Sequence, residues 1–144
     1  MSNYNLKIYC KIGLSKLKKI LPNYGKVIEY SVAILLLLNI LDIASTYIGI
    51  RYFNAYEANE MTAYFFNLFG MQIASGMKIL VVVLFCLTIK ILWKHSEILL
   101  AKKNYLINSI AIISSLNAIF IMILLNIIYV FILLNNIQVI YTNN

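Results

Sequence analysis

The sequence predicts an all-α polytopic membrane protein with three transmembrane helices, an N-terminal amphipathic helix and a short outer interfacial helix. Hydrophobic residues make up 62% of the 144 residues, and charged residues make up only 12%. An ordinary soluble domain carries about 25% charged residues, so a water-soluble fold is excluded. Three apolar runs are each long enough for the ~20 helical residues that cross the hydrocarbon core of a bilayer.

Residues 1–26 are expected to form a basic amphipathic helix on the cytoplasmic face. Between residues 4 and 21 the apolar side chains share one helical face and the lysines lie away from it, until Pro22 and Gly25 break the pattern. Such a segment binds a surface of anionic lipid. The alternative, a basic flank that becomes helical only where it touches lipid, stays open.

Residues 27–144 are expected to form one helical membrane domain, with spans at about 27–50, 71–93 and 105–134. The third run contains no charge, Gly or Pro, so it is read as one long tilted helix, although two shorter helices stay open as an alternative. The aromatic and apolar segment at about 59–70 is too short to span, and Gly70 is placed to end it. It predicts an outer interfacial or re-entrant helix.

Lysines precede the first span and surround the second connection, whereas the first connection has only Arg51 against Glu57 and Glu60. The positive-inside rule therefore predicts a cytoplasmic N-terminus and an outside C-terminus. The protein is expected in a cell membrane or a viral envelope.

Two opposite charges, Asp42 and Lys78, lie inside the first and second runs. Counted along each helix, both lie roughly 10 to 12 Å below the same boundary, at ~1.5 Å per residue. A single charge costs about 2.5–3.5 kcal/mol on insertion scales, so mutual neutralisation or contact with water is expected. The sequence therefore predicts an ion pair between the two helices.

Further polar residues are predicted to converge on this pair. They form one stripe on each helix: Asn39, Asp42 and Thr46 on the first, Gln72, Ser75 and Lys78 on the second, and Asn108, Ser115 and Asn126 on the third. Two readings stay open for these stripes. They hold helices together by hydrogen bonds, or they form a site for an ion, a proton or a ligand.

Asp42-x-x-x-Thr46, Glu57-x-Asn59 and Gly76-x-Lys78 resemble a small prokaryotic multipass membrane family of unknown function. The resemblance covers about residues 39–93, and Glu60 stands where the family pattern has Pro. It implies that Glu57 and Asn59 cap the outer mouth of the polar locus. The alternative is that Asn59 only caps the short helix.

Several functions are disfavoured by the residues present. The basic residues flank apolar runs and no nucleic-acid motif accompanies them, so no nucleic acid is expected as a partner. Cys10 and Cys86 have no metal-ligand spacing, and neither a metal nor a cofactor is expected. His95, the one histidine, lies among lysines far from Asp42 along the helices, so no catalytic triad can be assembled and catalytic residues are not assigned. A lipid-modifying enzyme stays open.

The leading prediction is a non-catalytic membrane component, either an accessory or assembly subunit or an envelope component, that acts through helix packing around the Asp42 and Lys78 locus. It is expected in a homo-oligomer or a larger membrane complex. The alternative is a proton- or ion-responsive transport or channel component that lines its pathway as an oligomer.

Overall fold

The computed structural model describes residues 16, 19–53, 57, 60–102 and 104–142. They form a 3₁₀ helix at Leu21–Tyr24 (η1) and four α-helices: α2 at Gly25–Phe53, α3 at Glu60–Phe69, α4 at Met71–Leu100 and α5 at Tyr105–Thr142. No strand occurs within these residues, so the predicted all-α class is confirmed. The predicted N-terminal amphipathic helix falls mostly outside the described residues.

Three of these helices, α2, α4 and α5, are long and apolar enough to cross a membrane, with mean hydropathies of 2.0, 2.2 and 2.6 over their most apolar stretches. A multipass membrane architecture is thereby confirmed at the level of length and composition. α4 and α5 both continue past the ends expected from the sequence, to Leu100 and Thr142. The third run is one uninterrupted helix, because no residue within it breaks the backbone hydrogen-bond ladder.

The α3–α4 connection and the start of α5 each have a recognisable local cause. Gly70 joins α3 to α4 with φ 78° and ψ 154°, a backbone region that is essentially restricted to glycine. Its N–H donates to Phe66 O and its carbonyl accepts from Ala74 N, so one residue ends α3 and starts α4. Before α5, the Asn104 side chain accepts from the Leu106 N–H, as an N-cap does.

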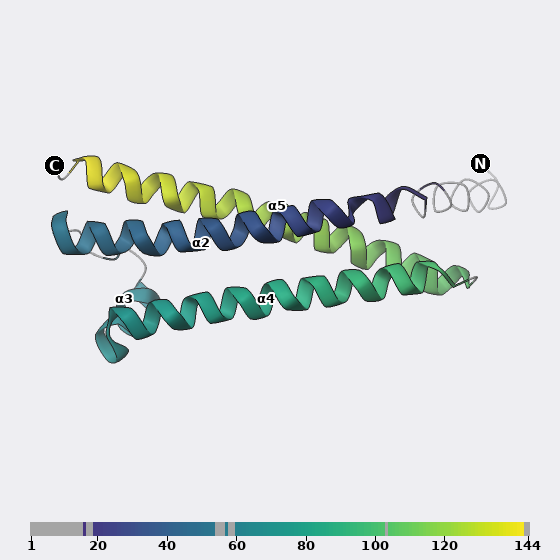
Figure 1. Cartoon of the computed structure of the whole chain (residues 1–144), viewed down its shortest axis with the longest axis horizontal. Coiled ribbons are helices and arrows are strands. Elements are labelled where there is room, and N and C mark those ends of the chain that lie inside the picture. The colour runs from purple at the N-terminus through teal and green to yellow at the C-terminus, as the bar shows by residue number, and fades with distance from the viewer. Residues whose placement is uncertain (1–15, 17–18, 54–56, 58–59, 103, 143–144) are drawn as a thin grey trace, which may run out of the picture.

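α2 and α5 run parallel to each other, and α4 runs antiparallel to both (Figure 1). α5 starts beside the end of α4, crosses the bundle and finishes beside α2. α3 folds back against the start of α4. The bundle therefore has two unlike ends. At the basic end α2 and α5 start and α4 finishes, and at the α3 end α2 and α5 finish and α4 starts.

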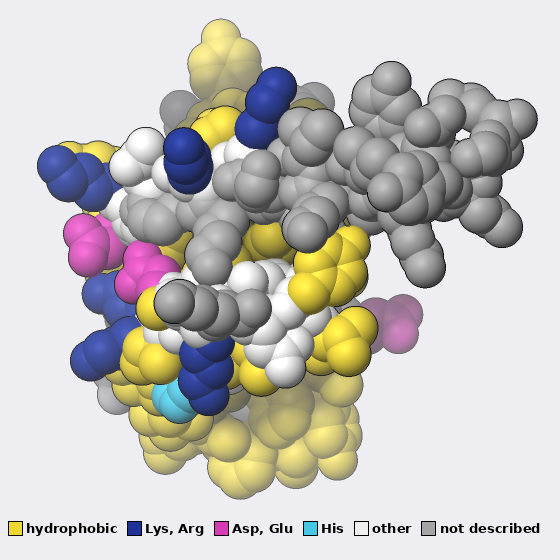
Figure 2. Space-filling view, turned by 90° about the vertical axis from the view of Figure 1, so that its right-hand side faces the viewer, with side chains coloured by type: hydrophobic (Ala, Val, Ile, Leu, Met, Phe, Trp, Pro, Cys, Tyr) yellow, Lys and Arg dark blue, Asp and Glu magenta, His cyan; other side chains and the backbone are white. Residues whose placement is uncertain are grey.

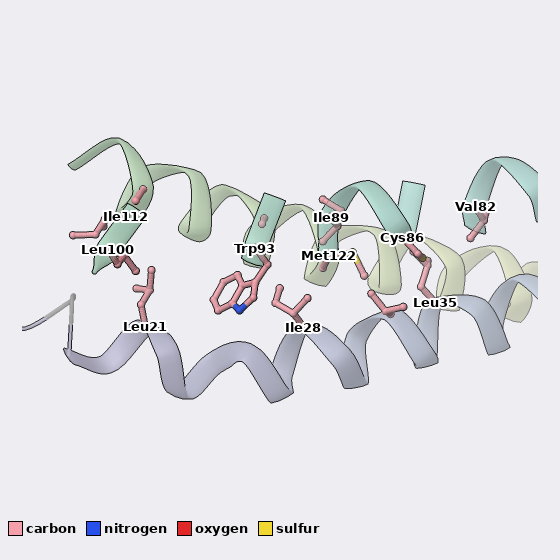
Figure 3. Packing of buried hydrophobic residues seen from close by; sticks show 13 residues of the cluster. Leu21, Ile28, Leu35, Val82, Cys86, Ile89, Trp93, Leu100, Ile112 and Met122 are labelled. Atoms are coloured by element: carbon pink, nitrogen blue, oxygen red, sulfur yellow. The ribbon is translucent and has the colours of Figure 1, made fainter. Parts of the chain in front are cut away.

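Apolar packing is concentrated in the half of the bundle near the basic end (Figure 3). Its largest buried side chains are Ile28 and Leu35 from α2, Trp93 from α4 and Met122 from α5. Ile28, Leu35, Asp42 and Gly49 are all buried on α2 at intervals of seven residues, the repeat of a supercoiled helix seam. Along this seam the apolar residues give way to Asp42 as the chain approaches the α3 end.

The basic end carries the exposed lysines Lys16, Lys19, Lys26, Lys94 and Lys102, and Figure 2 shows this end with its Lys side chains. Exposed Tyr, Leu, Ile, Val, Met or Phe side chains cover most of the outward surface of the helices, including Tyr30, Leu80 and Phe131. An apolar surface of this extent needs lipid or other helices against it.

Candidate functional site

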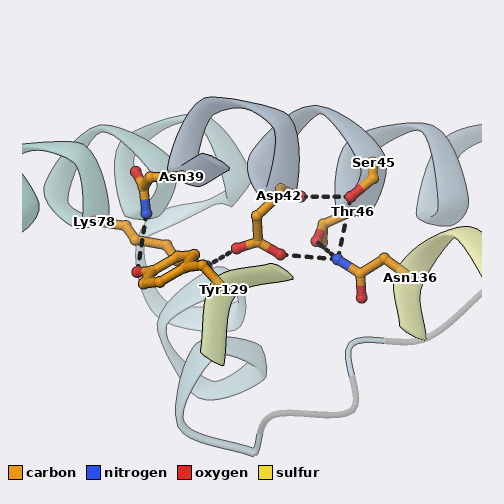
Figure 4. Close-up of polar contacts among 7 residues, drawn as sticks. All are labelled: Asn39, Asp42, Ser45, Thr46, Lys78, Tyr129 and Asn136. Carbon is orange, nitrogen blue, oxygen red and sulfur yellow. Dashed lines mark hydrogen bonds and ion pairs between the residues drawn. The ribbon is translucent and has the colours of Figure 1, made fainter. Parts of the chain in front are cut away.

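Asp42 of α2 and Lys78 of α4 form an ion pair between Asp42 Oδ2 and Lys78 Nζ. The Asp42 residue is 2% exposed, and the Lys78 side chain is 34% exposed. Their helices run antiparallel, and the pair lies in the half of the bundle near the α3 end (Figure 4). Asp42 is thus buried within the bundle, while the Lys78 side chain keeps about a third of its surface open.

Asn136 of α5 completes the coordination of the carboxylate. Its amide nitrogen Nδ2 lies 2.8 Å from Asp42 Oδ1, 3.1 Å from Ser45 Oγ and 3.3 Å from Thr46 Oγ1. The shortest of the three contacts is the one to the carboxylate, as expected for a charge-assisted hydrogen bond. Ser45 Oγ in turn donates to the Asp42 carbonyl oxygen at 2.9 Å. Each carboxylate oxygen of Asp42 therefore has a donor from a different helix.

A second polar contact lies one helical turn before Asp42. Asn39, which is 1% exposed, donates through Nδ2 to the hydroxyl oxygen of Tyr129 on α5 at 3.1 Å. Figure 4 shows the Tyr129 ring beside Lys78 and between Asn39 and Asp42. Asn39 and Asp42 are three residues apart, so they share the face of α2 that meets α5.

Asn126 forms a separate contact nearer the apolar core. Its Nδ2 donates to the carbonyl oxygen of Ser31 at 3.1 Å, which ties α5 to α2. Its Oδ1 is buried without a hydrogen-bond partner in the described part of the chain. Asn126 therefore acts between α2 and α5 and does not reach the ion pair.

Gln72 and Ser75 do not join Lys78. Both line a groove of about 620 Å³ between α2 and α4, together with Tyr47 and Met71, and Gln72 is exposed. The stripe predicted on α4 steps by three residues, and three residues turn an α-helix by about 300°, which is about 60° short of a full turn. After two steps Gln72 faces away from the side of α4 on which Lys78 lies.

Glu57 and Asn59 are the two residues expected to cap the outer mouth of the polar locus. Glu57 is half-buried in the segment between α2 and α3. Asn59, the expected cap of α3, lies outside the described residues.

Asn136 and Tyr129 are the site residues that the sequence analysis missed. Asn136 lies beyond residue 134, where the third span was expected to end, and Tyr129 was read as part of the apolar run. A signal for both was present, because residues 108, 115, 122, 129 and 136 are spaced by seven and share one face of α5. Ser115 and Met122 of this series are buried, and following the repeat past the apolar run would have reached Asn136.

The arrangement is a closed polar cluster, defined here as Asp42, Lys78, Asn136, Ser45 and Thr46. The formal charges of Asp42 and Lys78 cancel, and bonds to donors on α4 and α5 offset the desolvation of the carboxylate. Among the described residues no group of three His, Cys, Asp or Glu side chains lies close enough to hold a metal ion. The cluster can join three helices, and the Asp42 carboxylate can take up a proton or bind a ligand only if one of its contacts opens.

No protein-family model matches the chain, and no curated protein or solved structure matches it either.

Proposed function

We propose that this protein is a non-catalytic integral membrane component that works through helix packing, as an accessory or assembly subunit or an envelope component. The observation that carries the proposal is the closed coordination of Asp42 by Lys78 on α4 and Asn136 on α5. A carboxylate with every oxygen bonded to a neighbouring helix is suited to fixing helix positions. A conduction or catalytic site needs a group that is open to its substrate.

The position of the polar cluster supports this role. The apolar core lies near the basic end, where Leu35 and Met122 are buried. Lipid tails are as apolar as leucine, so apolar contact alone gives little drive for helices to associate in a membrane. Within a bilayer the polar cluster supplies specific contacts near the α3 end, where the helices lack a comparable apolar core.

The remaining apolar surface supports partners in the membrane. Only 11% of the most apolar stretch of α5 is buried inside the chain, against 33% for α2. Because its apolar stretch is the least covered of the three, α5 offers the largest apolar face for further copies or for helices of another subunit. A homo-oligomer or a larger complex is the arrangement proposed.

In this proposal the basic end faces the cytoplasm and the α3 end faces outside, because the exposed lysines gather at one end of the helices. Asp42 and Lys78 then form an intramembrane ion pair nearer the outer surface. α3 lies along that surface, where its exposed Tyr64 and Leu68 contact the interfacial region of the bilayer.

One observation favours a second candidate, a proton- or ion-responsive transport component. Lys78 is partly exposed while Asp42 is buried, so protonation of Asp42 would leave the partly exposed Lys78 without its counter-charge. If α2 and α4 moved apart when Asp42 was protonated, the charge of the cluster would control the arrangement of the helices.

Two substitutions separate the candidates. Asp42→Asn and Lys78→Met are purified in detergent and compared with Glu29→Gln and Lys90→Met, which change exposed charges on the same two helices. Native mass spectrometry measures assembly with copies or with co-purified partners, and a pH-sensitive dye in liposomes measures proton flux. The packing role predicts that both cluster variants lose assembly and that the two controls keep it.

The opposite result contradicts the packing role. If Asp42→Asn keeps the wild-type assembly and loses a proton or ion flux that the wild-type protein shows, the transport component is the correct reading. A separate measurement distinguishes a subunit of a complex from a homo-oligomer. The protein is purified from native membranes, and mass spectrometry identifies a stoichiometric partner only if it is a subunit of a complex.

A further inference from the structure

A pocket of about 280 Å³ lies beside the polar cluster, between α3, α4 and α5. Apolar side chains form most of its wall, among them Met61 and Phe65 of α3 and Met77 and Val82 of α4. The lining residues with polar side chains are Lys78, Tyr129 and Thr62. The pocket is thus apolar along its sides and polar where it meets the cluster.

Two donors at this pocket have capacity to spare. An ammonium group has three N–H donors, and among the described residues Lys78 uses one of them on Asp42. Tyr129 accepts a hydrogen bond from Asn39 through its hydroxyl oxygen, which leaves the hydroxyl hydrogen free to be donated. Lys78 and Tyr129 therefore keep donors that no described residue uses, and both residues line the pocket. A hydrogen-bond acceptor bound in the pocket would satisfy these donors.

The charge balance decides which kind of acceptor fits. The Lys78 charge is already cancelled by Asp42, so an added anion would bring an uncompensated negative charge next to the buried carboxylate. In low dielectric that repulsion is strong. An uncharged acceptor such as a carbonyl oxygen accepts the same hydrogen bonds without this repulsion.

The size and the wall of the pocket decide what carries the acceptor. A volume of about 280 Å³ equals roughly nine water molecules at ~30 Å³ each. Water needs two to four polar partners per molecule, which a mostly apolar wall does not provide. Met61 and Met77 are flexible side chains that adapt to an apolar chain of variable shape.

We propose that this pocket binds a membrane lipid through an uncharged carbonyl group. The carbonyl oxygen accepts hydrogen bonds from Lys78 and Tyr129, and the hydrocarbon part fills the space between α3 and α4. An ester of an acyl lipid and an isoprenoid quinone share this chemistry, so both are sources to be tested. The proposal goes beyond the packing role, since a cluster that only joins helices needs no ligand.

Native mass spectrometry of the delipidated full-length protein tests the carbonyl. Three probes are titrated: diacyl phosphatidylcholine, its dialkyl ether analogue, which lacks the carbonyl groups, and a naphthoquinone with an isoprenoid tail. One molecule of the ester lipid or of the quinone is expected to bind, with the ether analogue at least about tenfold weaker because it cannot accept the charge-assisted bond. The tighter of the two carbonyl probes identifies the source. If neither the ester lipid nor the quinone binds more tightly than the ether lipid, the proposal is overturned.

Ala74→Leu tests the location. Ala74 is 7% exposed and lines the pocket, so a leucine there occupies part of the pocket. Lipid binding is expected to weaken about tenfold, because the leucine displaces one or two apolar groups of the lipid from the pocket. Ala33→Leu is the matched control on the exposed face of α2, and Met77→Trp fills the pocket from its exposed rim if Ala74→Leu fails to fold. Unchanged binding in the folded pocket variants would overturn the proposal. Assembly is measured on the same samples, so loss of lipid with assembly intact is distinguishable from failure of the packing role.

Discussion

The Asn136 amide of α5 donates to Asp42 Oδ1 of α2 at 2.8 Å, although 94 residues separate the two in sequence. This contact places the last turns of α5 against α2 at the α3 end, where the apolar core has ended. It turns an ion pair between two helices into a cluster that involves all three long helices.

Asn136→Leu is expected to lower the stability of the fold by about 1.5–3 kcal/mol, because Asp42 loses a charge-assisted donor. Unfolding in a series of dodecyl sulfate mole fractions, followed by circular dichroism, measures the change. Asn135→Leu is the matched control, since Asn135 is exposed on the neighbouring position of the same helix. Equal unfolding curves for the two variants would show that the Asn136 contact contributes nothing.

The two charges of the ion pair are expected to differ in the cost of their removal. Lys78→Met leaves the buried Asp42 carboxyl without its counter-charge, and breaking a buried ion pair in this way costs about 3–5 kcal/mol. Asp42→Asn leaves Lys78 unpaired, but Lys78 is 34% exposed, so that variant is expected to lose less. The double variant is expected to be more stable than Lys78→Met alone. A double variant whose loss equals the sum of the two single losses would contradict an interaction between them.

Tyr129→Phe removes the acceptor of the Asn39 amide, which is 1% exposed. A buried donor left without a partner costs about 1–3 kcal/mol. The same unfolding assay is expected to show this loss for Tyr129→Phe and no loss for Tyr141→Phe, whose side chain is 83% exposed. A neutral effect at Tyr129 would mean that lipid or water replaces the acceptor.

Gly70→Ala is expected to destabilise the α3–α4 connection by about 1–3 kcal/mol, because its φ of 78° and ψ of 154° are unfavourable for any residue with a Cβ. Gly76→Ala is the control. A Cβ at Gly76 meets no atom within 4 Å, and alanine in a helix is favoured over glycine by about 0.5–1 kcal/mol. Hydrogen exchange of the α3 amides, followed by mass spectrometry, is expected to increase only in Gly70→Ala.

The sequence predicted the long helices because length and hydropathy alone select helices that span a membrane. It also predicted that Asp42 and Lys78 would approach each other, because two charges at similar depth lower their insertion cost by pairing. The helix ends were less predictable, since a helix continues past its apolar stretch as long as its backbone is satisfied, and Asn136 lies in that continuation. Gln72 and Ser75 illustrate a further limit, because spacing along one helix does not fix which neighbouring helix a side chain faces.

The ion pair between Asp42 and Lys78 is tested most directly by solid-state NMR of the protein in lipid. Asp42 is the only aspartate in the chain, so a ¹³C label on aspartate side-chain carboxyl groups reports a single site. With ¹⁵N on the lysine side chains, a rotational-echo experiment is predicted to dephase the Asp42 carboxyl signal, and Lys78→Met is predicted to abolish the effect. An Asp42 carboxyl signal that the lysine ¹⁵N label leaves unchanged in the wild-type protein would contradict the account.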